Sequence, residues 1–213
     1  LTNKLTRTVL AAYSGIAIPM AAMGMPIAVY LPRFYSEGMG LSLLTVGTVF
    51  FIARIWDVVT DPIMGVMIDK FDSRWGRRKH WIALSIPILL LSVWMVFMPN
   101  PENVSGLYLM FWLVLLYVGY TMLAISHQSW GVELSKSYDD RSRLFGWREI
   151  FVIGGMAVVL AIPAAMELSG HSEQATKVAS MGWFCLILFP LLAIPTLLWV
   201  PDSHNKPGVT IPW

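Results

Sequence analysis

Charged side chains are scarce in this sequence. Only 13% of its 213 residues are Asp, Glu, Lys or Arg, whereas 56% are hydrophobic. A soluble domain of this length needs more ionisable groups on its surface. Three stretches, 82–98, 107–124 and 151–166, contain no Asp, Glu, Lys, Arg or His. Segments that are apolar on every side belong in lipid or inside a helix bundle, so the composition excludes an ordinary soluble domain.

Other absences narrow the function. The single cysteine, Cys185, excludes an internal disulfide, and its apolar surroundings indicate a small buried hydrophobe. No Cys/His cluster has metal-ligand spacing, and neither a nucleophile elbow nor a Walker loop occurs, so we expect neither an enzyme nor a resident cofactor. A net charge of only +2, without basic clusters among exposed aromatics, argues against a nucleic-acid partner.

Six segments are long and apolar enough to cross a lipid bilayer. At about 1.5 Å per residue, each spans the roughly 30 Å of hydrocarbon. The first follows Lys4 and Arg7, as a signal peptide would, but it is too long and lacks a cleavage site, so we interpret it as a retained helix. The predicted spans are Thr8–Leu31, Leu44–Ile68, His80–Met98, Leu107–Val132, Trp147–Leu168 and Val178–Val200.

Basic residues predict the orientation of these spans. Eleven lie in the termini and in two loops that would share one side: Lys4, Arg7, Lys70, Arg74, Arg77, Arg78, Lys79, Lys136, Arg141, Arg143 and Lys206. Only Arg33 and Lys177 lie on the opposite side. The positive-inside rule therefore predicts that both chain ends are cytoplasmic, in a multi-pass protein of the inner (plasma) membrane. We expect residues 1–200 to form one six-helix bundle and 201–213 to begin a cytoplasmic loop.

The second span is unusual because it carries charge at its centre. Arg54, Asp57 and Asp61 follow helical spacing and share one face. A carboxylate at this depth costs at least about 2.5–3.5 kcal/mol. Arg54 offsets one Asp, which leaves a local charge near −1 that needs a cation or a proton. The alternative is a buried ion-pair network that only ties helices together.

The fourth span supplies neutral polar groups. Thr121 is a candidate oxygen ligand for a cation, and His127 and Gln128 are candidate donors to a solute. Taken singly, each is better explained as an interhelical hydrogen bond, because such bonds commonly join membrane helices.

Two charged loops on the predicted cytoplasmic side suggest a gate. Asp69, Arg77 and Arg78 lie between the second and third spans, and Asp140 and Arg141 between the fourth and fifth. Opposite charges in short loops can latch adjacent helices. Two such latches on one side suit a protein that opens and closes there.

These motifs resemble those of a known family. Gly40–Gly47, Ala53–Gly65, Arg74–Trp81 and Tyr138–Leu144 are similar to segments of the glycoside–pentoside–hexuronide:cation symporters, the melibiose-permease branch of the major facilitator superfamily. The resemblance extends from the first span to the sixth. The two-aspartate signature followed by the Arg-Trp-Gly loop is its most specific part.

The resemblance implies an all-α fold of twelve helices in two six-helix bundles, each a pair of inverted three-helix repeats. This chain would be the N-terminal bundle, with the C-terminal bundle as its missing partner. Such proteins move sugars or related solutes with Na⁺, Li⁺ or H⁺. By resemblance, Asp57, Asp61 and Thr121 serve the cation and Arg148 lies near the solute.

One departure concerns the solute. Galactoside carriers of this family hold the sugar with acidic residues on the first and fourth helices, and the matching positions here are Ala21 and Ala124. Galactosides are therefore not the expected substrate, and Arg148, His127, Gln128 and Arg54 remain as candidate solute-binding residues. One other reading stays open, a half-sized membrane protein acting as a homodimer or structural partner. The absence of catalytic motifs argues against a membrane-embedded enzyme or receptor.

Overall fold

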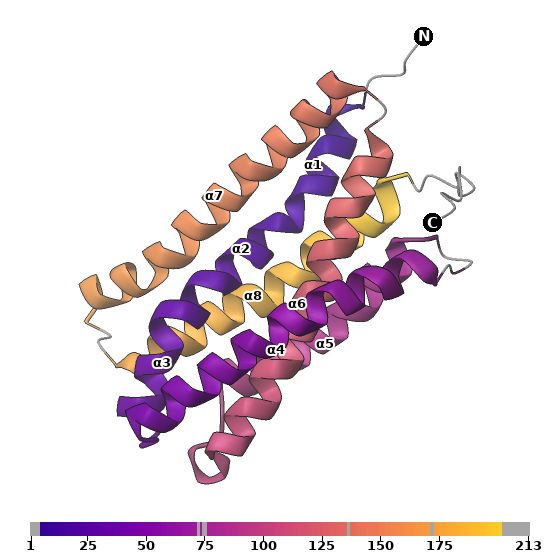
Figure 1. Cartoon of the computed structure of the whole chain (residues 1–213). Helices are drawn as coiled ribbons and strands as arrows, with labels where there is room; N and C mark the ends of the chain where they lie inside the picture. The colour runs from indigo at the N-terminus through magenta and orange to yellow at the C-terminus, as the bar shows by residue number, and fades with distance from the viewer. Residues whose placement is uncertain (1–4, 72, 74–75, 136, 171–172, 202–213) are drawn as a thin grey trace.

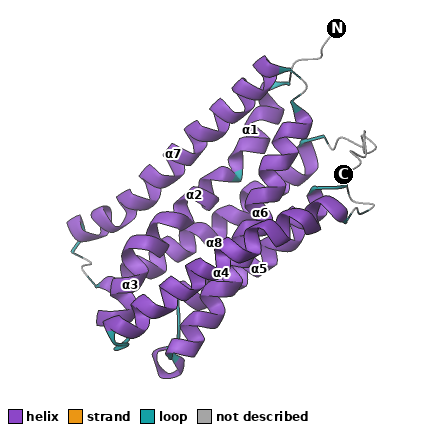
Figure 2. Ribbon diagram, viewed as in Figure 1, coloured by secondary structure: helices purple, strands orange, loops and turns teal. Residues whose placement is uncertain are grey.

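The computed structural model describes residues 5–71, 73, 76–135, 137–170 and 173–201. In this part helices joined by short loops and turns are the only regular secondary structure (Figure 2). Six helical segments within it are long and apolar enough to cross a membrane. The first consists of α1 (Arg7–Gly15), α2 (Ala17–Met25), η1 (Pro26–Tyr30), α3 (Leu31–Arg33) and η2 (Phe34–Gly38). The others are α4 (Leu43–Lys70), α5 (Lys79–Phe97), α6 (Gly106–Leu134), α7 (Tyr138–Leu168) and α8 (Gln174–Trp199), with the short η3 (Pro101–Asn103) before α6.

Short hydroxyl side chains begin four of these helices. Thr6, Ser42, Ser105 and Ser137 each accept a hydrogen bond from the backbone N–H three residues later, at the starts of α1, α4, α6 and α7. Such caps satisfy a donor that the helix itself leaves unpaired. They explain where the helices begin better than hydropathy does.

The fifth span is longer than predicted. Helix α7 begins at Tyr138 and not at Trp147, so the part of the expected charged loop from Tyr138 onward is helical. Hydropathy marks only the stretch that lies in lipid, whereas the helix continues past it to the Ser137 cap. Asp139 and Asp140 favour this start because acidic groups stabilise the first turn of a helix.

The first span also exceeds its prediction, ending at Gly38 and not at Leu31. Its polar end reads as a loop in the sequence, yet the chain continues helically through two wide π turns, η1 and η2. An ion pair between Arg33 and Glu37, 2.7 Å apart and one turn from each other, joins this extension. The remaining spans agree with prediction to within four residues at each end.

The most extensive helix–helix contacts follow the same pattern in the two halves of the bundle. The first span packs against the fifth and sixth (α2 with α7, α1 with α8), while the fourth packs against the second and third (α6 with α4 and α5). The third and sixth spans, α5 and α8, pack against each other. If the first span is exchanged with the fourth, the second with the fifth and the third with the sixth, the same pairs of spans are in contact. That relationship is the one expected of two three-helix repeats in a major facilitator bundle.

Two helices are covered much less than the rest. In the most apolar stretch of α4 and of α7 only 17% of residues are buried, against 61% in the first span. These helices are the second and fifth spans, which are equivalent under the exchange of halves. Both lie along the outside of the bundle (Figure 1).

The helix ends gather the charged residues. α1, α5 and α7 begin, and α4, α6 and α8 end, at the same end of the bundle (Figure 1). We call this the basic end because Lys70, Arg77, Arg78 and Lys79 lie there, as do Arg141 and Arg143 near the start of α7. The predicted loop 201–213 lies outside the described residues apart from Pro201.

Candidate cation site and solute cavity

Two carboxylates on α4 meet one hydroxyl on α6. Thr121 Oγ1 lies 3.1 Å from Asp57 Oδ1 and 2.8 Å from Asp61 Oδ1. Asp57 and Asp61 are one turn apart, and the packing of α4 on α6 brings Thr121, itself buried, against both. The structure thus brings together the three residues predicted to serve a cation.

The geometry of this trio leaves room for one positive charge. A hydroxyl has one proton, so Thr121 can donate to only one carboxylate at a time. The second short contact then joins two oxygens that carry lone pairs, and it is favourable only when a proton or cation lies between them. Three oxygens in this arrangement suit a hard cation such as Na⁺ or Li⁺.

Arg54 contacts this site from one side. Its Nη1 donates to Asp57 Oδ2 at 3.1 Å, the oxygen that does not face Thr121. The guanidinium also lies over the ring of Tyr117, 5.7 Å from its centroid. Because a single arginine faces two aspartates, this group has a formal charge of −1 when both carboxylates are ionised. Asp61 remains exposed although it contacts Thr121.

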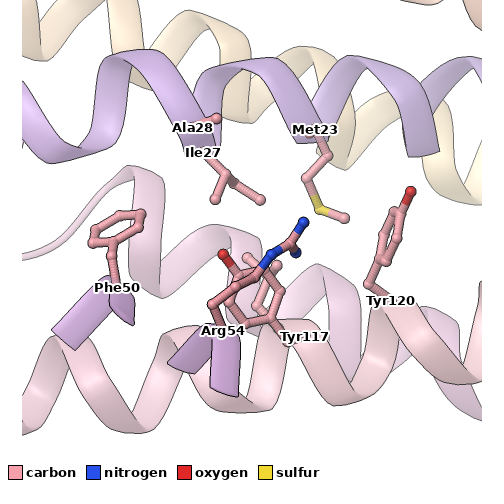
Figure 3. Close-up of a pocket in the computed structure, with 9 residues that line it drawn as sticks. Met23, Ile27, Ala28, Phe50, Arg54, Tyr117 and Tyr120 are labelled. Carbon is pink, nitrogen blue, oxygen red and sulfur yellow. The ribbon is translucent and has the colours of Figure 1, made fainter. Parts of the chain in front are cut away.

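A cavity of about 400 Å³ opens next to this site. Residues from the first span, from α4 and from α6 line it: Met23, Gly24, Ile27, Ala28, Phe50, Arg54, Leu116, Tyr117 and Tyr120. Figure 3 shows the Arg54 guanidinium reaching into the space between Met23 and Ile27, with Tyr117 beside it. The walls are mostly aromatic and aliphatic, and Arg54 supplies the charge.

A second cavity of about 400 Å³ adjoins the first, since Gly24 and Tyr120 line both. Arg148 and Glu149 on α7 supply its charged groups and are paired at 2.5 Å. The Arg148 side chain is largely buried, and its Nε has no hydrogen-bond partner among the described residues. Ala21 lines this cavity where a sugar-binding carboxylate would be expected by resemblance.

The structure does not bring His127 or Gln128 to either cavity. His127 is fully buried against α1, where its ring stacks on Tyr13 at 4.0 Å between centroids. The two residues exchange hydrogen bonds, because Tyr13 Oη donates to the His127 carbonyl and His127 Nε2 contacts the Tyr13 carbonyl. This arrangement joins α1 to α6. Gln128 is exposed and does not line these cavities.

Asp69, Arg77 and Arg78, the predicted latch residues, lie together at the end of α4. Arg78 is buried and contacts Asp69 at 2.7 Å and Glu133 of α6 at 2.9 Å, while its Nη1 donates to the Ile68 carbonyl. Arg77 donates to the Asp69 carbonyl at 3.3 Å. Together these contacts tie the end of α4 to the start of α5 and the end of α6.

The second predicted latch has a different form. Asp140 lies in the first turn of α7, where it accepts from the Ser137 hydroxyl and pairs with Arg143 at 3.9 Å. Arg141 is exposed on the same turn. These contacts are local to the start of α7, so this group caps a helix more than it joins two.

Several functional or structural contacts were not predicted from the sequence. Tyr117 and Tyr120 line the cavity, and helical spacing from Thr121 would have placed Tyr117 on the same face. Lys79 donates to the Leu197 carbonyl at 3.0 Å and lies over the Trp130 ring, which fastens α5 to the end of α8. No sequence pattern indicates that contact, because its partners are 118 residues apart.

Comparison with known proteins agrees with this architecture. A family model described as MFS/sugar transport protein matches residues 12–208. The isoprimeverose transporter of Lactiplantibacillus pentosus is 27% identical over 190 residues, which cover 86% of this chain and 38% of that protein. The inner membrane symporter YicJ of Escherichia coli is 26% identical over 171 residues, or 78% of this chain and 37% of that protein.

A third relative, the putative glycoside/cation symporter YagG of Escherichia coli, is 26% identical over 162 residues, covering 74% of this chain and 34% of that protein. The chain therefore spans little more than a third of the length of these relatives.

Proposed function

Because this chain belongs to the MFS/sugar transport protein family, we propose that it forms the N-terminal bundle of a cation-coupled symporter for a sugar or a related small organic solute. Relatives named as a glycoside/cation symporter and as an isoprimeverose transporter support this class of solute. The coupling cation is Na⁺, Li⁺ or H⁺. The solute occupies the two adjoining cavities, between Arg54 and Arg148.

The observation that carries this proposal is the double contact of the Thr121 hydroxyl with Asp57 and Asp61. An empty site holds a net charge of −1 at membrane depth, and moving that charge through the apolar interior is unfavourable. A bound cation removes the charge. The carrier therefore changes conformation readily only when the cation site is filled, which is the physical basis of coupling.

A second bundle completes the transport path in this proposal. The exposed faces of α4 and α7 include Asp61, which lipid would solvate poorly. A second six-helix bundle packed on these two helices would cover Asp61 and enclose the cavities. The Arg78 latch, with Asp69 and Glu133, lies at the end of the bundle that we assign to the cytoplasm, where it would stabilise one conformation of the carrier.

Uptake into proteoliposomes tests the proposal. The natural protein should accumulate a labelled glycoside when a Na⁺, Li⁺ or H⁺ gradient is imposed. Asp57→Asn and Asp61→Asn should each remove gradient-driven accumulation, because the neutral amide no longer requires a cation. Both variants should still reach the membrane, as measured by immunoblot. Accumulation at the unmodified level in both variants would reduce the acidic pair to a structural role and contradict the proposal.

A further inference from the structure

Arg54 belongs to the cation site and to the solute cavity at once. Its Nη1 contacts Asp57 Oδ2 at 3.1 Å, and the same guanidinium lines the cavity beside Tyr117. The Arg54 side chain is 69% exposed, whereas that of Asp57 is only 14% exposed. The charged end of Arg54 thus stands in open cavity space (Figure 3). Its partner Asp57 is largely covered.

The two oxygens of Asp57 are divided between two partners. Oδ1 faces Thr121 and the cation site, and Oδ2 accepts from Arg54. A cation bound between Asp57 and Asp61 and the guanidinium of Arg54 are therefore alternative positive charges for one carboxylate. Electrostatic repulsion between them weakens whichever contact is easier to give up.

The Arg54 contact is the easier one to give up. It joins residues three apart on the surface of a helix, through one hydrogen bond at 3.1 Å, and the guanidinium is exposed. Ion pairs of this kind contribute little, because they are well solvated and flexible. The Asp57 contacts toward Thr121 are more deeply packed.

We propose that Arg54 couples the two sites by exchanging partners: cation binding at Asp57 and Asp61 releases its guanidinium from Asp57, and the released guanidinium donates hydrogen bonds to acceptor oxygens of the solute in the cavity. Arginine suits this role because it has five N–H donors, of which a single one reaches Asp57. The Tyr117 ring keeps the side chain within the cavity throughout. This inference rests on the proposed function and takes a metal cation, Na⁺ or Li⁺, as the coupling ion.

Because Arg54 would contact the cation site and the solute in turn, its removal should affect cation binding and solute binding in opposite directions. This makes the proposal testable without knowing the natural solute. If Arg54 competes with the cation for Asp57, its removal must strengthen cation binding in the absence of solute. If Arg54 also holds the solute, the same removal must weaken solute binding and make it independent of the cation. A purely structural role for Arg54 would lower both affinities, since removing it would leave Asp57 without its partner.

The first experiment titrates the natural protein in nanodiscs with Na⁺ and with Li⁺, followed by intrinsic tryptophan fluorescence. Arg54→Gln should bind the cation roughly fivefold or more tightly than the unmodified protein, the lower end of typical coupling between sites. The cation affinity of Arg54→Lys should lie between those of Arg54→Gln and the unmodified protein. Arg33→Gln, which removes an arginine that lines neither of these cavities, should leave the cation affinity within twofold. Weaker cation binding in Arg54→Gln would overturn the proposal.

The second experiment measures binding of methyl β-D-glucoside and methyl β-D-glucuronide, a neutral and an anionic form of one ring, in Na⁺ and in K⁺. At least one should bind roughly fivefold or more tightly in Na⁺, and Arg54→Gln should remove that difference. Arg33→Gln, a matched change of an arginine that does not line these cavities, should keep it. Binding of neither compound, or an undiminished difference in Arg54→Gln, would overturn the proposal.

The outcomes also separate this inference from the proposed function. If Asp57→Asn and Asp61→Asn both retain gradient-driven uptake at the unmodified level, the proposed function fails. If Asp57→Asn loses uptake but Arg54→Gln keeps a cation-dependent solute affinity, the proposed function stands and the partner exchange fails. If the unmodified protein binds neither Na⁺ nor Li⁺, the proton remains as coupling ion for the proposed function, and the exchange mechanism is excluded.

Discussion

The hydroxyl of Thr121 lies 2.8 Å from Asp61 Oδ1 and joins the fourth span to the acidic face of the second. The two residues are 60 positions apart in the chain and meet only because α6 packs along α4. The contact converts a pair of repelling carboxylates into a three-oxygen site.

Removal of the Thr121 hydroxyl should weaken the cation site without unfolding the protein. Thr121→Val keeps the branched shape but loses the oxygen, and we expect roughly a tenfold loss of apparent cation affinity, in line with about 1–1.5 kcal/mol for one polar contact. Thr121→Ser retains the oxygen and should stay within about threefold of the unmodified affinity. The apparent cation affinity of each variant is measured from the dependence of uptake on cation concentration. Equal behaviour of the valine and serine variants would exclude Thr121 as a ligand.

Gly155 permits the close approach of α7 to α2. A Cβ at Gly155 would lie 2.5 Å from the carbonyl oxygen of Ile18, whereas a Cβ at the neighbouring Gly154 meets nothing within 4 Å. Gly155→Ala should destabilise the bundle by about 1–3 kcal/mol through overpacking. Gly154→Ala is the matched control and should leave the stability unchanged or raise it, because alanine favours helix. The thermal midpoints of both variants in detergent are measured by size-exclusion chromatography after heating. Equal midpoints would contradict this packing.

Arg78 should contribute strongly to stability at the basic end. Its buried guanidinium joins Asp69, Glu133 and the Ile68 carbonyl, so Arg78→Gln leaves two carboxylates without their shared cation. We expect a loss of about 1–3 kcal/mol, because both carboxylates are partly solvated. Arg33→Gln removes an exposed arginine at the opposite end and should leave the thermal midpoint unchanged. A midpoint of Arg78→Gln equal to that of Arg33→Gln would show that the latch is dispensable for folding.

Single cysteines should report the orientation of the bundle. Glu102 in η3 and Asp139 in the first turn of α7 are both exposed and lie at opposite ends. A membrane-impermeant maleimide should label Glu102→Cys in intact cells and Asp139→Cys only after permeabilisation. Background should be low because the native Cys185 is buried. The reverse labelling pattern would mean that the basic end faces outward and that the charge rule fails here.

Much of the fold was predictable because lipid imposes strong constraints. The number of spans and their centres followed from hydropathy. In hydrocarbon, backbone N–H and C=O groups must be hydrogen-bonded to each other, so a long apolar segment there forms a helix. Helix ends were less predictable where the helix leaves the membrane: α7 starts at Tyr138, and the first span ends at Gly38. Beyond the bilayer, caps and first-turn charges determine the ends, and hydropathy does not report them.

The candidate site likewise has a part that could be predicted from the sequence and a part that could not. That Asp57 and Asp61 share a helix face with Arg54 follows from the sequence alone, because helical spacing depends only on position along one chain segment. The contact of Thr121 with both carboxylates, the position of Tyr117 under Arg54 and the stacking of His127 on Tyr13 away from both cavities could be seen only in the folded bundle. Such contacts depend on how each helix is rotated and shifted against its neighbours. That relative placement is set by side-chain packing over the whole bundle, and no local pattern of residues contains it.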